Sequence, residues 1–139
     1  MTSGDESIPS NLRDWKYRTG WILSGLAILF LVMDSTMKLL ALPVVLDAGA
    51  ALGLVGVRMA RALGTILMVC TILYAAPRTA VLGAILLTGF LGGAVATHMR
   101  AEDPLFSHVL FGVYLGIVVW AGIYLRDANL RALIPICKN

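Results

Sequence analysis

Long apolar stretches recur along this chain, separated by short polar segments that contain proline or charged residues. An α-helix needs roughly 20 apolar residues to cross the hydrocarbon core of a bilayer, and several of the stretches approach or reach that length. Hydrophobic residues make up 59% of the chain and charged residues only 14%. A water-soluble domain of 139 residues could not bury so much apolar surface, and so the sequence predicts an integral membrane protein.

The apolar stretches predict an all-α membrane protein, with the whole chain 1–139 forming one membrane domain built as a four-transmembrane-helix bundle. The spans are expected at residues of about 19–42, 59–76, 80–98 and 105–125. Residues 1–18 are expected to form a polar N-terminal tail, and residues 126–139 a C-terminal tail. Pro43 ends the first span, because proline cannot continue a helix, and the pair Asp103-Pro104 is typical of a helix start.

The segment 44–58, VVLDAGAALGLVGVR, connects the first two spans. It is too apolar for a plain loop, and too short and interrupted for a further span. We expect a short interfacial or re-entrant helix that lies on the membrane surface or dips into it.

Four spans place both termini on the same side of the membrane, and the positive-inside rule identifies that side. Only Arg58, Arg61 and Arg100 fall on the opposite side, while Lys38 lies within the first span. We therefore expect both termini to face the cytoplasm. The cations that fall on the terminal side are Arg13, Lys16, Arg18, Arg78, Arg126, Arg131 and Lys138.

Polar side chains gather at the other ends of the spans. Asp34 and Lys38 stand four residues apart with the acid first, which is the favourable order for a helical ion pair. Charges within a span are costly and usually face the bundle interior or a wet cavity. We predict a small polar pocket at the extracytoplasmic mouth of the bundle, roofed by the connecting segment. Its expected ligand-binding residues are Asp34, Lys38, His98, Arg100 and His108.

Each of these residues also has a purely structural interpretation. The Asp34–Lys38 pair can serve only to bury a helix end, Arg100 can anchor a lipid phosphate, and the histidines can bond to carbonyl groups. A proton relay through the histidines is an intermediate case, because histidine titrates near neutral pH. We expect no metal site, because no further ligand set is spaced to complete one around the histidines. The chain has no nucleophile motif and no glycine-rich phosphate loop, so whether it is an enzyme stays open.

Glycines recur at four-residue spacing in the last two expected spans, as Gly89 with Gly93 and Gly112 with Gly116. Small residues at this spacing let helices approach closely in lipid. We expect both pairs to pack the helices of the bundle against one another, the alternative being the interface of a dimer.

The motif GGAVATHMR, followed by Asp103-Pro104 and Ser107-His108, resembles the DoxX-like family of small bacterial four-helix membrane proteins. The resemblance extends upstream through APRTAVLG and GWILSGLAILFLVMDSTMKLL, and covers nearly the whole chain apart from its tails. Many members carry an acidic residue early in the second span, whereas this chain reads RALGTILMV there, with Gly64 and Thr65. The resemblance implies a multi-pass protein of the bacterial inner (plasma) membrane.

The resemblance also implies a range of functions, because members of the family are linked to a membrane thiosulfate:quinone oxidoreductase and to other membrane oxidoreductase complexes. The leading hypothesis is an accessory subunit of a membrane redox system, whose pocket contacts quinone or a lipid-like molecule. One alternative is a membrane assembly factor that packs against the helices of a partner. Another is a stand-alone enzyme that uses His98, His108 and Asp34 as acid–base groups.

The expected partners are the bilayer, a redox protein or a second copy of the chain. Nucleic acid is not an expected partner, since the chain has no basic run.

Overall fold

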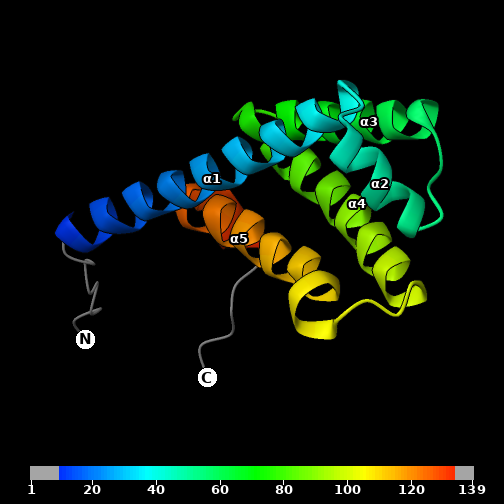
Figure 1. The fold of residues 1–139 in the computed structure, drawn as a ribbon. Coiled ribbons are helices and arrows are strands. Elements are labelled where there is room, and N and C mark those ends of the chain that lie inside the picture. The colour runs from blue at the N-terminus through cyan, green and yellow to red at the C-terminus, as the bar shows by residue number, and fades with distance from the viewer. Residues whose placement is uncertain (1–9, 134–139) are drawn as a thin grey trace, which may run out of the picture.

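The computed structural model describes residues 10–133, and every regular element in that range is helical. Figure 1 shows how the long helices are arranged. In chain order the elements are α1 (Ser10–Leu39), α2 (Pro43–Ala51), α3 (Val57–Ala75), α4 (Ala80–Arg100), the single π-helical turn η1 (Leu105–Val109), α5 (Phe111–Arg126) and α6 (Ala128–Leu133).

Four helical segments are long and apolar enough to cross a membrane. The prediction of an all-α, four-span membrane protein is therefore confirmed, and α2 fits the expected short helix between the first two spans. The four segments are Asp14–Leu39, Val57–Ala75, Ala80–Arg100 and Leu105–Arg126.

The helix ends differ in detail from the expected spans. Helix α1 begins at Ser10, within the polar segment 1–18, and ends at Leu39 rather than at residue 42. The fourth long segment begins with η1, in which the carbonyl of Pro104 accepts from the backbone N–H of both His108 and Val109. The outer parts of the two expected tails, residues 1–9 and 134–139 with Lys138 among them, lie outside the described residues.

The four long helices form a closed ring in which α1 packs against α3 and α5, and α4 packs against the same two helices. Figure 1 shows α4 and α5 side by side, sloping away from α1 toward the elbow that joins them. All four helices are therefore close together where α3 turns into α4, and the α1–α3 pair diverges from the α4–α5 pair toward the other end.

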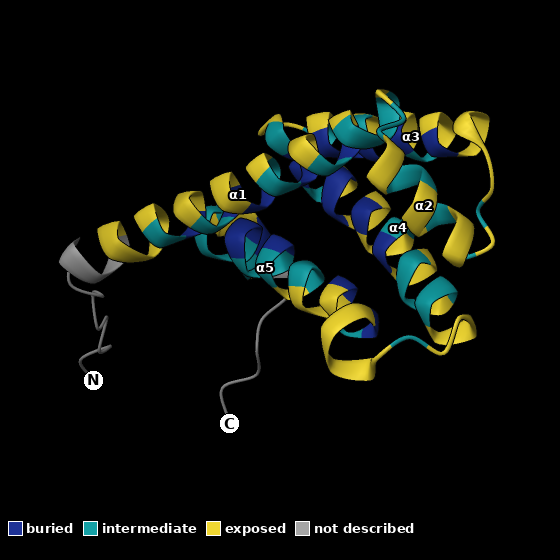
Figure 2. Cartoon of the chain, in the orientation of Figure 1, coloured by how far each residue is buried: buried dark blue, intermediate teal, exposed yellow. Residues whose placement is uncertain are grey.

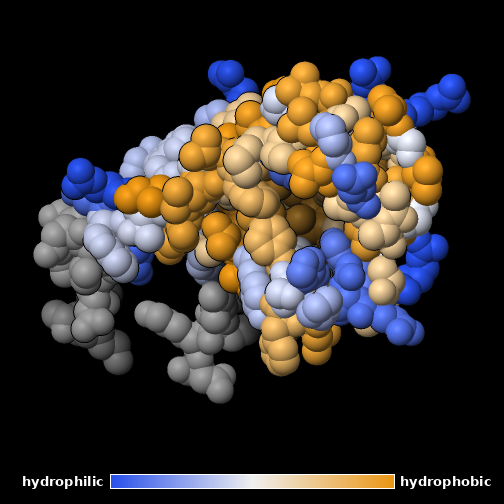
Figure 3. All heavy atoms as spheres, viewed as in Figure 1, coloured by the Kyte–Doolittle hydropathy of each residue, from blue (hydrophilic) through white to orange (hydrophobic). Residues whose placement is uncertain are grey.

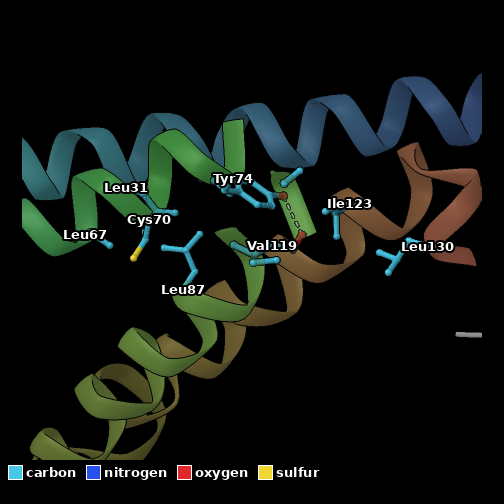
Figure 4. Packing of buried hydrophobic residues seen from close by; sticks show 11 residues of the cluster. Leu31, Leu67, Cys70, Tyr74, Leu87, Val119, Ile123 and Leu130 are labelled. Atoms are coloured by element: carbon cyan, nitrogen blue, oxygen red, sulfur yellow. Dashed lines mark hydrogen bonds between the residues drawn. The ribbon is translucent and has the colours of Figure 1, made fainter. Parts of the chain in front are cut away.

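The tightly packed end centres on Tyr74 of α3, whose side chain is fully buried. Its hydroxyl donates to the carbonyl of Val119 on α5 over 2.8 Å and lies 3.0 Å from the Ser24 hydroxyl of α1. Figure 4 shows Tyr74 among the aliphatic side chains that surround it. This one hydroxyl thus joins three helices in surroundings that offer no water as a substitute. The aliphatic neighbours include Leu31, Leu67, Leu87, Val119 and Ile123.

Gly83 lets α3 and α4 meet backbone to backbone beside that residue. A Cβ atom added there would overlap the backbone of Tyr74 and lie 2.7 Å from the carbonyl carbon of Leu73. Gly25, in contrast, lies on a face of α1 where an added Cβ would meet nothing within 4 Å. Close approach of backbones is what holds helices together where lipid already solvates apolar surfaces.

The outer faces of the long helices are apolar and exposed (Figure 2), as expected of surfaces that face lipid rather than water. Figure 3 shows hydrophobic residues over much of the visible face, with hydrophilic residues gathered in its lower part and around its rim. Ile22, Leu29, Ile72, Ile85 and Ile117 are each more than half exposed. The apolar exterior supports the assignment of these helices to the bilayer.

We expect Gly83→Ala to lower the free energy of unfolding by about 1–3 kcal/mol, the usual cost of overpacking, because α3 and α4 must separate to admit the methyl group. The matched variant Gly25→Ala should cause no loss, since its methyl group meets open space and alanine favours the helix. Thermal unfolding in detergent, followed by circular dichroism, measures both. Equal stabilities for the two variants would contradict this account of the α3–α4 contact.

Candidate functional site

A cavity of about 620 Å³ lies where the helices spread apart, between α1, α3, α4 and the start of α5. Its wall is largely apolar. The lining side chains from the long helices include Phe30, Leu31, Leu63, Leu67, Phe90, Leu91 and Phe111.

Helix α2 closes one side of this cavity, as expected for the segment 44–58. Val45, Leu46 and Gly49 are among its residues on the cavity wall, and none of its nine residues is fully buried. The chain enters α2 after Ala41, which has a φ of 50°, and leaves it through Gly53, with a φ of 77°. These left-handed residues turn the chain sharply at both ends of the helix.

The acidic and basic groups of α1 meet on the cavity wall. Asp34 and Lys38 form an ion pair along one face of the helix, and their side chains are 32% and 21% exposed. Each charge therefore has its counter-charge at hand, which lowers the cost of placing both beside an apolar space.

The two histidines also line the cavity, where α4 ends and α5 begins. Their ring centroids lie 6.0 Å apart. The Nδ1 atom of His98 lies 2.6 Å from Oδ2 of Asp103, and Nδ1 of His108 lies 2.7 Å from the Ser107 hydroxyl. Each ring is thus held through its Nδ1 atom. Among the described residues, the Nε2 atom of each ring has no hydrogen-bond partner and can bind another molecule.

Arg100 is the expected ligand-binding residue that the structure does not place on the cavity wall. Its Nη2 atom donates to the carbonyl of Leu52 over 2.8 Å. The guanidinium thereby fastens the end of the α2 segment to the end of α4. The other four expected residues, Asp34, Lys38, His98 and His108, all line the cavity.

The glycines of α4 have a different role from the expected one. Gly89 and Gly93 line the cavity, and a Cβ atom added at either would meet nothing within 4 Å, so no neighbouring helix packs on them. The expected packing does hold for Gly112 of α5, where an added Cβ would lie 2.9 Å from Val95 Cγ2 of α4. The α4 pair therefore leaves space inside the bundle.

A second hollow of about 660 Å³ runs along the outside of the bundle between α4 and α5. Its wall includes Gly92 and Gly116, with Trp120 and Tyr124 toward one end. The indole N–H of Trp120 donates to the Thr88 hydroxyl over 2.8 Å, which ties the two helices together there. This groove is open to the outside of the bundle.

Asp103 and Ser107 were missed as site residues by sequence reasoning. Asp103 stands five positions after His98, beyond the end of α4, and reaches back because Glu102 takes a left-handed conformation with a φ of 58°. A spacing of five across a turn gives no regular pattern to find. Within residues 10–133, no group of three or more His, Cys, Asp or Glu side chains is placed to hold a metal ion.

These features define a multi-pass helical membrane protein with a mostly apolar internal cavity whose wall carries paired polar groups. The DoxX-like family model matches residues 22–122, well over half of the chain, and so the protein belongs to the DoxX-like family. The matched range contains α2, both histidines and the Asp34–Lys38 pair. No significant match was found among curated proteins or solved structures.

The Asp34–Lys38 pair predicts a non-additive effect on stability. Asp34→Asn and Lys38→Met should each lower the free energy of unfolding by about 1–3 kcal/mol, between the values for exposed and fully buried pairs, because each leaves one charge unpaired at the cavity. The double variant should lose less than the sum of the two. Unfolding of the wild type, the two single variants and the double variant in the same detergent completes a double-mutant cycle. Strict additivity would show that the two charges do not interact.

Proposed function

We propose that this DoxX-like protein binds a lipid-like molecule, with quinone as the first candidate, in the cavity between α1, α2, α3 and α4, and that it does so as an accessory subunit of a membrane redox system. The observation that carries the proposal is the composition of the wall: apolar side chains make up most of it, and an imidazole pair and an ion pair are set into it.

The size and lining of the cavity suit an amphipathic ligand. Small-molecule sites commonly have volumes of roughly 300–1,000 Å³ and combine an apolar wall with a few convergent polar groups, and the volume here of about 620 Å³ falls in that range. The missing side chains at Gly89 and Gly93 widen the cavity along α4. A wholly polar ligand would leave the aliphatic wall without favourable contacts.

The polar groups on the wall suit the head of a quinone or of its reduced form. The Nε2 atoms of His98 and His108 are open to a partner, and the aromatic rings of Phe30, Phe90 and Phe111 lie on the same wall. A quinone ring carries two oxygens and an apolar tail, which matches imidazole groups set into an otherwise apolar wall. Electron transfer would then involve a partner protein, as the resemblance to subunits of membrane oxidoreductases implies.

Filling the cavity tests this proposal. We expect Gly89→Leu to reduce the amount of retained ligand at least roughly tenfold, because the new side chain projects into the cavity without displacing any neighbour. Gly25→Leu is the matched control, since that position is equally unobstructed but does not line the cavity. Native mass spectrometry with lipid extraction, on protein purified gently from its own membrane, measures retention.

The same experiment separates the proposal from its alternatives. Quinone in the wild-type protein and in Gly25→Leu, but not in Gly89→Leu, supports a cavity site. Only bulk phospholipid in all three, together with a co-purifying membrane protein, would contradict the proposal and favour an assembly factor. In that case the groove between α4 and α5 is the surface to examine for a partner helix.

We further propose that the protein resides in the bacterial inner membrane with both termini in the cytoplasm. Lys16, Arg18 and Arg78 support this orientation through the positive-inside rule. So does Arg126, whose guanidinium carbon lies 4.6 Å from the ring centroid of Trp21, an arrangement suited to a membrane interface. The cavity would then open in the extracytoplasmic half of the bilayer.

Reporter fusions test the orientation. Green fluorescent protein fused to either terminus should fluoresce, because it folds in the cytoplasm, whereas alkaline phosphatase at the same positions should stay inactive. As a control, alkaline phosphatase inserted next to Glu102, in the α4–η1 elbow, should be active. The reverse pattern would overturn the proposed orientation.

A further inference from the structure

The contact between His98 and Asp103 fixes which ring nitrogen of His98 carries hydrogen. A carboxylate can only accept a hydrogen bond, so the Nδ1 atom, 2.6 Å from Asp103 Oδ2, must be the donor. In the neutral imidazole, the other nitrogen, Nε2, then carries a lone pair and can only accept. A carboxylate behind a histidine is a common device for fixing its tautomer and its orientation.

Nε2 of His98 is available to a ligand. The ring lines the cavity. Among residues 10–133 the ring makes a single hydrogen bond, from Nδ1 to Asp103. Asp103 itself is not part of the cavity wall, so it supports the ring from behind. The cavity therefore presents a hydrogen-bond acceptor of fixed position.

The charges on the cavity wall exclude a strongly charged ligand head. Lys38 is neutralised by Asp34, and the nearby Arg100 points its Nη2 at the carbonyl of Leu52 instead of lining the cavity. An anionic head would meet no unpaired cation among the described lining residues, and it would face the lone pair of His98. An uncharged head that can donate a hydrogen bond is the better complement.

We infer that the cavity selects an uncharged amphiphile whose head carries a hydroxyl group, and that this hydroxyl donates to Nε2 of His98 while Asp103 holds the acceptor tautomer. The inference rests on the proposed function and makes it more specific. For a quinone, it means that the reduced, dihydroxy form binds more tightly than the oxidised, dicarbonyl form, because only a hydroxyl can donate to the lone pair.

A pair of probes that differ only at the hydroxyl tests this inference. We expect wild-type protein in nanodiscs to bind para-octylphenol roughly fivefold more tightly than its methyl ether, para-octylanisole, which is the effect of about one net hydrogen bond. His98→Phe keeps a planar ring but has no ring nitrogen, so the two probes should bind it equally. Competition with a fluorescent amphiphile measures both affinities.

Asp103→Asn tests the orienting role separately. An amide can donate to Nδ1 as well as accept from it, so the acceptor form of Nε2 is no longer enforced and the preference for the phenol should fall. The substitution removes no helix cap, because the N-cap of η1 is Pro104 and no side chain caps it. The matched control is Glu102→Gln, which removes the neighbouring exposed carboxylate outside the His98 contact and should keep the wild-type preference.

The outcomes are distinct. Equal affinity of the wild type for the two probes, or an undiminished preference in His98→Phe, overturns the inference, and an undiminished preference in Asp103→Asn overturns the role of Asp103. Binding of neither probe by the wild type is instead a failure of the proposed function. A comparison of decylubiquinol with decylubiquinone in the absence of oxygen then identifies the source of the hydroxyl. Tighter binding of the quinol supports a hydroquinone as the ligand. A preference confined to the phenol pair supports another hydroxyl-bearing lipid.

Discussion

The bundle depends on the close approach of helices around Tyr74. Lipid solvates apolar side chains about as well as other helices do, so the helices gain little from burying them and must be held by close packing and by polar contacts. Here Gly83 brings the α3 and α4 backbones together, and the Tyr74 hydroxyl joins α5 and α1 through Val119 and Ser24. An unsatisfied hydroxyl in that position would cost more than it does in water, which makes the network specific as well as stabilising.

The cavity is a consequence of this packing at one end. The four helices are held closely at the α3–α4 turn, and from there the α1–α3 pair and the α4–α5 pair incline away from each other (Figure 1). Small residues such as Gly89 do not fill the space between the two pairs. The polar groups that line the gap are each given a partner: Asp34 has Lys38, His98 has Asp103, and His108 has Ser107. The wall of this space can therefore carry polar groups without leaving unpaired charges in the membrane.

The start of α3, where the resemblance led us to expect an acidic residue, packs closely on α1. Gly64 of α3 packs directly on α1: an added Cβ would lie 2.9 Å from Lys38 Cβ and 3.0 Å from the Ser35 carbonyl oxygen. A carboxylate side chain does not fit there. The next residue, Thr65, turns its hydroxyl back to the Arg61 carbonyl of its own helix. The acidic group that faces the cavity in this protein is thus supplied by α1, as Asp34.

The sequence by itself determined the membrane class, the number of spans and the short helix α2, because length and hydropathy suffice to place helices in a bilayer. It also singled out Asp34, Lys38, His98 and His108, which the structure places on the wall of one cavity. Only the tertiary structure decided that Gly89 and Gly93 face a cavity while Gly112 meets a helix, that Arg100 fastens α2, and that Asp103 turns back to His98. Helical periodicity fixes which residues share a face, but what stands opposite that face depends on how the helices incline and how the turns between them fold.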